Sequence, residues 1–201
     1  MRSGKTVGKR IAIIQGHPDP SGQRLGHALA GAYAAGAEAS GHQVRLIDVA
    51  RLDFPLLRTQ REFESGTLPE SLRGAQADIG WAEHLVLFFP LWLGTMPALL
   101  KGFLEQVFRP GFAFGPGPDG KPWGKRLKGR SARIVVTMGM PALMYRWYFR
   151  AHGLKGLERS VLGFCGIAPI RETLIGMVEA SDDRARERWL AKLRAQGGAG
   201  R

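Results

Sequence analysis

Five short apolar segments alternate along the chain with longer segments of helical pattern, and this alternation restricts the possible folds more than any other feature. The apolar segments lie at residues 10–16, 42–49, 84–90, 131–139 and 170–177. The third, HLVLFFP, is apolar almost throughout, which predicts a central strand buried on both faces. Each connection is long enough to hold a helix. We therefore expect an α/β fold in which helices cover both faces of a five-stranded parallel sheet, the doubly wound class.

The remaining segments complete the prediction. We expect helices at 22–40, 69–83, 96–108, 142–154, 155–164 and 181–195, with Ser181 as the N-cap of the last, irregular chain at 50–68 and a Gly/Pro-rich loop at 110–130. Residues 1–9 are predicted to be a disordered basic tail, and the last residues to fray. Residues 10–196 then form a single domain, as is usual for a chain of 201 residues.

Composition and charge limit the functional classes. The single cysteine, Cys165, lies in an apolar stretch and is expected to be buried, and no disulfide can form within the chain. Prolines and a glycine interrupt the longest apolar run, so we expect a soluble protein of the cytoplasm. The net charge of +12 favours anionic partners. A nucleic-acid-binding module is one alternative, although no nucleic-acid motif is present.

Basic residues are concentrated between Lys121 and Arg133, where six of them occur without an acidic residue. The stretch is either a solvated surface loop or a patch that binds phosphate groups. No group of His, Cys, Asp and Glu residues has the spacing of metal ligands, so no metal is expected.

Three loops follow the predicted strands, and ligands of doubly wound folds bind at the carboxyl ends of the strands. The first loop, residues 16–24, leads into a helix, whose first backbone N–H groups attract anions. His17, Ser21, Gln23 and Arg24 can all donate hydrogen bonds to a phosphate. Ser21 could instead only cap the helix.

The second and third loops offer apolar surface and close backbone approach. In the second loop, Pro90 ends the central strand, and the three residues that follow are Leu91, Trp92 and Leu93. They either offer a flat apolar surface and backbone polar groups to the ring of a ligand, or they pack in the core. In the third, TMGM at 137–140, Gly139 permits close approach of a ligand to the backbone. Tyr145 and His152 follow, and each is either structural or catalytic. Because no nucleophile–base pair stands out, a cofactor is expected to supply the chemistry.

Three segments together resemble the flavodoxin-like NAD(P)H:quinone oxidoreductase family. They are GHPDPSG…HAL, FFPLWLGTMPALLKGFLEQVF and WYFRAHGLKGLERSVLGFCGI, and the similarity extends from about residue 10 to residue 195. The family includes quinone reductases, modulators of drug activity and ancillary oxidoreductases of potassium efflux systems. The resemblance implies a flavodoxin-like fold, a flavin (FAD in preference to FMN), and two-electron ping-pong transfer from NADH or NADPH to a quinone-like acceptor. It also implies a homodimer with the site at the subunit interface.

The resemblance assigns roles to residues of this chain. His17, Ser21, Gln23 and Arg24 match the phosphate-binding stretch, and residues 90–93 match the segment against the isoalloxazine ring. The segment Thr137, Met138, Gly139 and Met140 matches the pyrimidine side of the ring, and Tyr145 matches a tyrosine at the substrate face. The aromatic segment Tyr145, Trp147, Tyr148 and Phe149 would suit such a subunit interface.

The chain also departs from the family pattern. Many members have Asn near the position of Arg24 and a second Gly where this chain has Met140, and His152 is displaced by one residue from the spacing of the family's active-site histidine. Azo or nitro compounds are alternative acceptors to quinones. A regulatory flavoprotein subunit of a membrane transport system, which the basic stretch could serve, is the other alternative.

Overall fold

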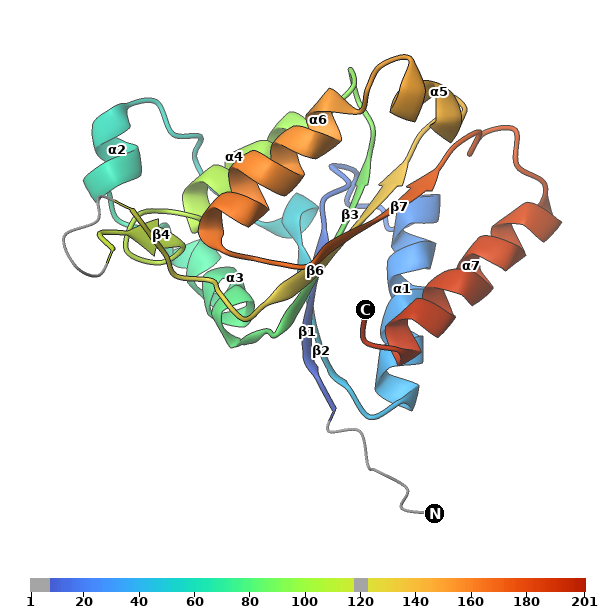
Figure 1. The fold of residues 1–201 in the computed structure, drawn as a ribbon, viewed down its shortest axis with the longest axis horizontal. Helices are drawn as coiled ribbons and strands as arrows, with labels where there is room; N and C mark the ends of the chain where they lie inside the picture. The colour runs from blue at the N-terminus through green and yellow to red at the C-terminus, as the bar shows by residue number, and fades with distance from the viewer. Residues whose placement is uncertain (1–7, 118–122) are drawn as a thin grey trace.

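Five parallel strands form one sheet, with the order β2-β1-β3-β6-β7 (Figure 1). This is a computed structural model, and it describes residues 8–117 and 123–201. The strands are β1 (Arg10–Gln15), β2 (Gln43–Asp48), β3 (His84–Pro90), β6 (Ser131–Thr137) and β7 (Ile170–Ile175). The predicted five-stranded, doubly wound sheet is confirmed. The order reverses between β1 and β3, so a crevice opens at the carboxyl ends of these two strands.

Helices cover both faces of the sheet (Figure 1). One face carries α1 (Leu25–Ala39) and α7 (Asp183–Gly198), and the other carries α3 (Glu70–Trp81), α4 (Ala98–Val107), α6 (His152–Lys155) and the π-helical segment η3 (Gly156–Gly163). Strand β3 serves both cores, since Phe88 packs with the α1–α7 side and Leu87 and Phe89 with the other side. This double burial explains why HLVLFFP lacks the polar alternation of a one-sided strand.

Helices α1 and α7 pack with their backbones in close approach at glycines. A Cβ atom added to Gly36 would lie 2.0 Å from the carbonyl oxygen of Arg194, and one added to Gly197 would lie 2.0 Å from that of Tyr33. These distances are far shorter than any van der Waals contact. Only glycine at these two positions therefore permits the observed helix spacing.

The ends of the described chain are more ordered than expected. Asp182, not Ser181, caps α7, because its carboxylate accepts from the Ala185 N–H at 2.7 Å. The Ser181 hydroxyl instead donates to the Val178 carbonyl. The predicted fraying is wrong, since α7 continues to Gly198. Lys9, assigned to the tail, bonds His42 Nδ1 through its N–H; the rest of that tail, residues 1–7, lies outside the described residues.

The region predicted to be irregular at 50–68 contains a short 3-10 turn, η1 (Val49–Arg51), at its start and a helix, α2 (Gln60–Ser65). A capping box begins α2: the Thr59 hydroxyl accepts from the Glu62 N–H at 3.1 Å, and the Glu62 carboxylate accepts from the Arg58 N–H at 2.8 Å. The loop expected at 110–130 holds two short paired strands, β4 (Phe114–Gly115) and β5 (Gly124–Lys125).

The basic stretch is a surface loop only in part, and Lys121 lies outside the described residues. Lys125 and Lys128 are exposed, but Arg133 lies in β6 and is buried. Its guanidinium donates to the Thr173 hydroxyl at 2.7 Å and to the Arg201 carbonyl oxygen at 2.9 Å. Arg130 likewise donates to the Gly80 carbonyl oxygen. Two of the six cations thus hold the fold together and do not form a ligand patch.

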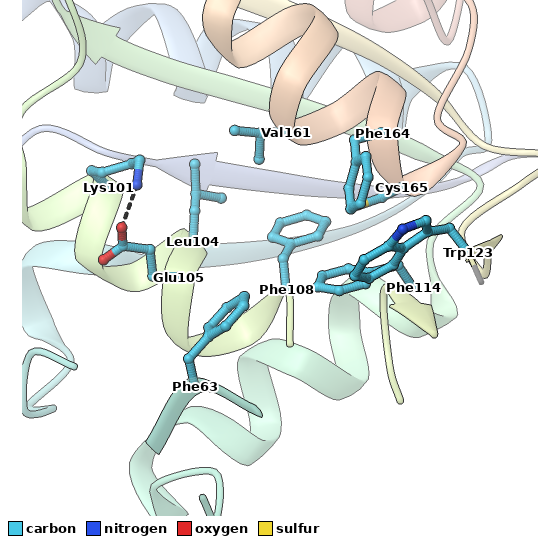
Figure 2. Close-up of a pocket in the computed structure, with 10 residues that line it drawn as sticks. All are labelled: Phe63, Lys101, Leu104, Glu105, Phe108, Phe114, Trp123, Val161, Phe164 and Cys165. Atoms are coloured by element: carbon cyan, nitrogen blue, oxygen red, sulfur yellow. Dashed lines mark hydrogen bonds and ion pairs between the residues drawn. The ribbon is translucent and has the colours of Figure 1, made fainter. Parts of the chain in front are cut away.

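An apolar cavity of about 310 Å³ lies where α2, α4 and the β4–β5 hairpin meet η3 (Figure 2). Its wall is largely aromatic, with contributions from Phe63, Phe108, Phe114, Trp123 and Phe164. Lys101 and Glu105 form an ion pair on α4 beside it. Cys165 also lines this cavity, and burial raises the pKa of its thiol to about 11. The prediction of a buried cysteine is confirmed.

Within the part of the chain that the structure describes, no helix combines the length and apolar character needed to cross a bilayer.

Candidate functional site

The three loops that follow β1, β3 and β6 converge on one cavity of about 560 Å³. This volume falls within the usual range for sites of small ligands, about 300–1,000 Å³. Its walls consist of His17, Asp19, Arg24, Leu25, Gly26, Pro90, Leu91, Trp92, Thr137, Met138, Gly139, Val178 and Glu179. The structure therefore brings together eight of the residues that the sequence assigned to cofactor binding.

His17 is held in one orientation at the start of the first loop. The ring Nδ1 of His17 accepts from the Asp19 backbone N–H at 3.0 Å, and the backbone N–H of His17 donates to the Gln15 side-chain oxygen at 3.1 Å. Burial, and then the neighbouring His27, lower the pKa of His17. A neutral ring whose Nδ1 accepts must carry its proton on Nε2. His17 can thus donate one hydrogen bond from Nε2 to a ligand.

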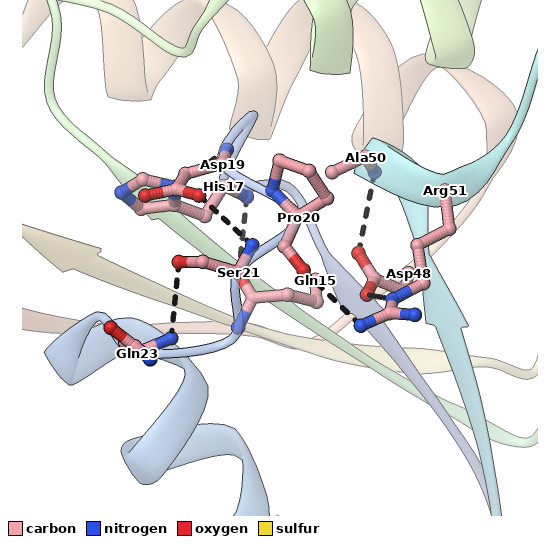
Figure 3. A network of polar contacts seen from close by, with 9 residues as sticks. All are labelled: Gln15, His17, Asp19, Pro20, Ser21, Gln23, Asp48, Ala50 and Arg51. Carbon is pink, nitrogen blue, oxygen red and sulfur yellow. Dashed lines mark hydrogen bonds and ion pairs between the residues drawn. The ribbon is translucent and has the colours of Figure 1, made fainter.

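The same loop leaves the N-terminus of α1 open. Arg24 is the N-cap residue, and within the described residues no side chain caps the helix. The Ser21 hydroxyl accepts from the Gln23 N–H at 3.4 Å, so Ser21 orders the loop without capping α1 (Figure 3). Ser21 and Gln23 are exposed and lie outside the cavity lining. The first N–H groups of α1, together with Arg24, are available for an anion.

The second loop turns sharply after Pro90. Trp92 and Thr95 exchange two backbone hydrogen bonds, of 2.9 and 3.0 Å, and the two residues between them, Leu93 and Gly94, have φ values of 47° and 81°. Positive φ at both central residues defines a type I′ turn. Trp92 lines the cavity, while the fully exposed Leu93 lines an adjacent apolar cavity between α4 and α6. The Leu91 N–H donates to the Thr137 carbonyl, which joins the second and third loops.

The third loop supplies a smooth wall. Thr137 ends β6, the buried Met138 donates its N–H to the Ile175 carbonyl, and Gly139 is exposed to the cavity. A Cβ added at Gly139 would meet nothing closer than the Glu179 carboxylate, at 3.9 Å. The packing of the protein therefore does not require a glycine at this position, and the missing side chain leaves space in the cavity. Met140 is half-buried and lies outside the lining.

The two residues considered for catalysis lie elsewhere. Tyr145, on α5 (Ala142–Trp147), is buried, and its hydroxyl donates to the Gly94 carbonyl at 3.1 Å and accepts from the Leu154 N–H at 3.2 Å. The hydroxyl thus holds the type I′ turn and has no free path to a substrate. His152 is exposed at the start of α6. Arg150 and Ala151 before it both have positive φ, which interrupts the helix predicted at 142–154.

Five cavity residues were not assigned from the sequence: Asp19, Leu25, Gly26, Val178 and Glu179. Leu25 and Gly26 begin α1, directly after the first loop. Asp19 stands in the first loop, where the spacing Asp-Pro-Ser would have predicted an Asx turn, since a carboxylate often accepts from the N–H two residues later. Val178 and Glu179 follow β7, an edge strand whose carboxyl end shares the rim with β6. The parallel order of the sheet would have placed them there.

The cavity therefore has two chemically different ends. At one end, Arg24, the His17 Nε2–H group and the α1 N-terminus suit a phosphate; at the other, Trp92, Met138 and the bare Gly139 backbone suit a flat ring. A phosphorylated aromatic ligand such as a flavin fits this arrangement.

Comparison with known proteins agrees with this geometry. Residues 9–196 match the family described as having the flavodoxin-like fold. The chain is 32% identical over 178 residues to a ribosyldihydronicotinamide dehydrogenase-like protein of Penicillium crustosum, covering 76% of this chain and 64% of that protein. It is 28% identical to an uncharacterized NAD(P)H oxidoreductase of Haemophilus influenzae, covering 92% and 91% of the two chains.

The fold also matches a solved NAD(P)H:quinone oxidoreductase of Methanothermobacter marburgensis with a TM-score of 0.77 at 24% identity, covering 96% of this chain and 98% of that one. The chain thus spans just under two thirds of the Penicillium protein and nearly all of the other two. Fold, strand order and sequence agree, and the chain belongs to the family with the flavodoxin-like fold.

Proposed function

We propose that this protein is a flavin-dependent NAD(P)H:quinone oxidoreductase. The observation that carries the proposal is the single cavity that joins an open helix N-terminus with Arg24 to a flat apolar wall at Trp92 and Gly139. Such a cavity accommodates a phosphate and an aromatic ring at the same time. The relatives named as NAD(P)H oxidoreductases support the same chemistry. FAD is the preferred flavin and FMN the alternative.

In this proposal the first loop holds the phosphate end. The His17 Nε2–H, the Arg24 guanidinium and the first N–H groups of α1 would donate to phosphate oxygens. The ring would lie against Trp92 and Gly139, with Thr137 and Met138 at its polar edge. Ser21 and Gln23 would support the loop from outside. Tyr145 is assigned a positioning role, because its hydroxyl fixes the Gly94 carbonyl and thereby the turn that presents Trp92.

The flavin, when bound, carries the two electrons of a hydride between the two substrates in turn. NADH or NADPH would be the hydride donor, and a quinone would be the acceptor that takes up the hydride and one proton from solvent. The residues of this chain contribute binding, orientation and exclusion of water. The exposed His152 is proposed to donate a hydrogen bond to the acceptor.

The visible absorption spectrum tests the proposal first. Purified protein, incubated with FAD and FMN and then desalted, is expected to retain the two flavin bands. Under nitrogen, NADH or NADPH is expected to bleach them, and one equivalent of a benzoquinone is expected to restore them. A protein that stays colourless after incubation with both flavins would exclude the flavoenzyme assignment. If the flavin bands are present but NADH and NADPH do not bleach them, the assignment of a flavin site stands and the assignment as a reductase is excluded.

We also propose that the protein is a homodimer that pairs through α5. Trp147 and Tyr148 are both 76% exposed there, and Leu93, in the turn that Tyr145 of α5 holds through the Gly94 carbonyl, is fully exposed. Exposed aromatic side chains in one patch are typical of interface cores, and a two-fold axis would bury both copies of the patch at once. This arrangement would place the open side of the cavity at Trp92 near the second subunit.

Light scattering in solution tests the pairing. The wild-type protein is expected to have twice the chain mass. The double variant Trp147→Ser/Tyr148→Ser is expected to raise the dissociation constant at least about thirtyfold, because one central aromatic residue contributes about 2 kcal/mol to an interface. Leu46→Ser, which removes a 62% exposed apolar side chain from the edge strand β2, serves as the control and should leave the mass unchanged. A wild-type monomer at micromolar concentration would refute the pairing.

A further inference from the structure

A further cavity, of about 140 Å³, lies between α1 and the edge strand β2, and we call it the α1–β2 cavity. Beyond His27, the residues of α1 that line it are all small: Ala30, Gly31 and Ala34. They follow His27 by three, four and seven positions, so all four residues share one face of the helix. Because this face carries so little side-chain volume, a gap remains between α1 and β2.

Strand pairing directs polar side chains of two strands toward one end of this gap. Gln15 ends β1 and Asp48 ends β2, and the parallel register pairs these two residues, so their side chains leave the same face of the sheet. It is the face that α1 covers, because Ile13, two residues before Gln15, packs in the core on the α1 side. Leu46, two residues before Asp48, forms an exposed apolar wall of the cavity.

Two of the polar side chains at this end have unpaired groups. Gln15 is buried, and its Oε1 accepts from the His17 N–H, but its Nε2 has no hydrogen-bond partner among the described residues. Both ring nitrogens of His27 are buried and likewise unpaired within the part of the chain that the structure describes. Roughly 90% or more of buried polar groups in proteins have a partner. Two such exceptions in the lining of one cavity indicate that a bound molecule supplies the missing partners.

The charges at the polar end compensate each other. Asp48 Oδ2 forms an ion pair with Arg51 at 3.0 Å, and Asp48 Oδ1 accepts from the Ala50 N–H at 3.3 Å (Figure 3). Each carboxylate oxygen can accept a further hydrogen bond. The side chains of Gln15 and a neutral His27 offer N–H donors, while His27 and Asp48 offer acceptors. An uncharged ligand that both accepts and donates hydrogen bonds satisfies this set of groups.

We propose that the α1–β2 cavity binds an uncharged six-membered ring that carries an amide group. A cavity of about 150 Å³ holds one benzene ring, and the side chains of Ala30, Ala34 and Leu46 would contact the faces of the ring. The amide oxygen would accept from the Gln15 Nε2–H group, and the amide N–H would donate to Asp48. Nicotinamide and uracil both have this chemistry. No residue lines both this cavity and the proposed flavin cavity, so the inference is independent of the proposed function.

NMR spectroscopy of the ¹⁵N-labelled protein, with benzamide as the probe, tests the proposal. Benzamide is expected to shift the side-chain amide signals of Gln15 and the backbone signals of residues 27–34, with a dissociation constant of about 1 mM for a ligand of this size. Benzoate has the same ring, lacks the N–H donor and brings a negative charge beside Asp48, so it should bind at least about tenfold more weakly. Titrations with nicotinamide and with uracil then show which of these two ligands the cavity prefers.

Two variants place the ligand. Gly31→Leu fills the cavity from α1, because Gly31 lines it and an added Cβ there meets nothing within 4 Å, and the shifts should disappear. Gly74→Leu, the same change at an exposed and open position on α3, is the matched control and should leave the affinity unchanged. Gln15→Met keeps the length of the side chain and loses its N–H donors, so binding should weaken about fivefold, the contribution of one hydrogen bond.

Each contrary result overturns a defined part of the proposal. Absence of shifts in the wild-type protein at about 10 mM benzamide, ten times the expected dissociation constant, would mean that the cavity takes up water only. Equal affinities of wild type and Gly31→Leu would place the ligand outside this cavity. Equal affinities for benzamide and benzoate would refute the recognition of an amide. The flavin titrations of the wild-type protein are separate measurements, so the proposed function stands or fails independently of these results.

Discussion

Gly139→Leu is expected to abolish flavin binding while leaving the fold intact. The backbone at Gly139 has an ordinary φ, and the space above it belongs to the cavity, with the nearest atom to an added Cβ at 3.9 Å. The Cβ of a leucine would therefore enter the cavity without striking the protein, and the rest of the side chain would extend into the space proposed for the ring. We expect a loss of flavin affinity of at least about a hundredfold, or about 2.7 kcal/mol. The melting temperature should change by less than about 2 °C.

Fluorescence titration of the apoprotein with flavin measures the loss, and Gly74→Leu provides the comparison. Gly74 is exposed on α3, away from the cavity, and an added Cβ there also meets nothing within 4 Å. Both variants add the same side chain to an open position, and only one of the positions faces the cavity. Flavin affinity in Gly139→Leu equal to that in Gly74→Leu would show that the ring does not lie against β6.

Gly36→Ala is expected to destabilise the protein by about 3 kcal/mol or more, beyond the usual effect of a single methyl group in a well-packed core. The added Cβ would lie 2.0 Å from the Arg194 carbonyl oxygen and 2.7 Å from its carbon. The neighbour is backbone, so no side-chain rotation can relieve the clash. Helices α1 and α7 must move apart, and contacts along both helices weaken.

Gly31→Ala on the same helix provides a matched control. Gly31 is exposed, and an added Cβ meets nothing within 4 Å. This variant should be more stable than wild type by about 0.5–1 kcal/mol, since alanine loses less backbone entropy than glycine in a helix. Urea unfolding followed by circular dichroism gives both values. Equal stabilities for Gly36→Ala and Gly31→Ala would contradict the close packing of the two helices.

The elements that the sequence predicted well are those specified by local pattern. The run at 84–90 contains the buried residues of β3 because both faces of that strand are covered, and helix α1 ends where Gly41 takes a positive φ. Helix α2 was missed although its Thr59–Glu62 capping box is visible in the sequence, because it is only a short helix among prolines and polar residues. The order at Gly197 could not be predicted, since it depends on contact with Tyr33 on a distant helix.

For the candidate site too, the sequence predicted the features that depend on local pattern and strand order. The three loops were identified because parallel strands end at a common edge, and they line one cavity in the structure. The surroundings of individual side chains were not accessible from sequence. Burial of Tyr145 depends on Gly94 and Leu154, residues that its own helix does not contain. The place of Glu179 beside Gly139 depends on the pairing of β7 with β6. The roles of the site residues stay predictions.

The pairing of α1 with α7 also affects how the chain acquires its shape during synthesis. The ribosome releases α1 about 160 residues before the end of α7, and at about 5–20 residues per second this interval lasts about 10–30 s. Within the described residues, α7 is the only helix that packs along the glycine-containing face of α1. Throughout this interval that face therefore has no helix packed against it. The α1 side of the sheet therefore closes only after α7 has been synthesised, and the loop that begins α1 acquires its final support at that point.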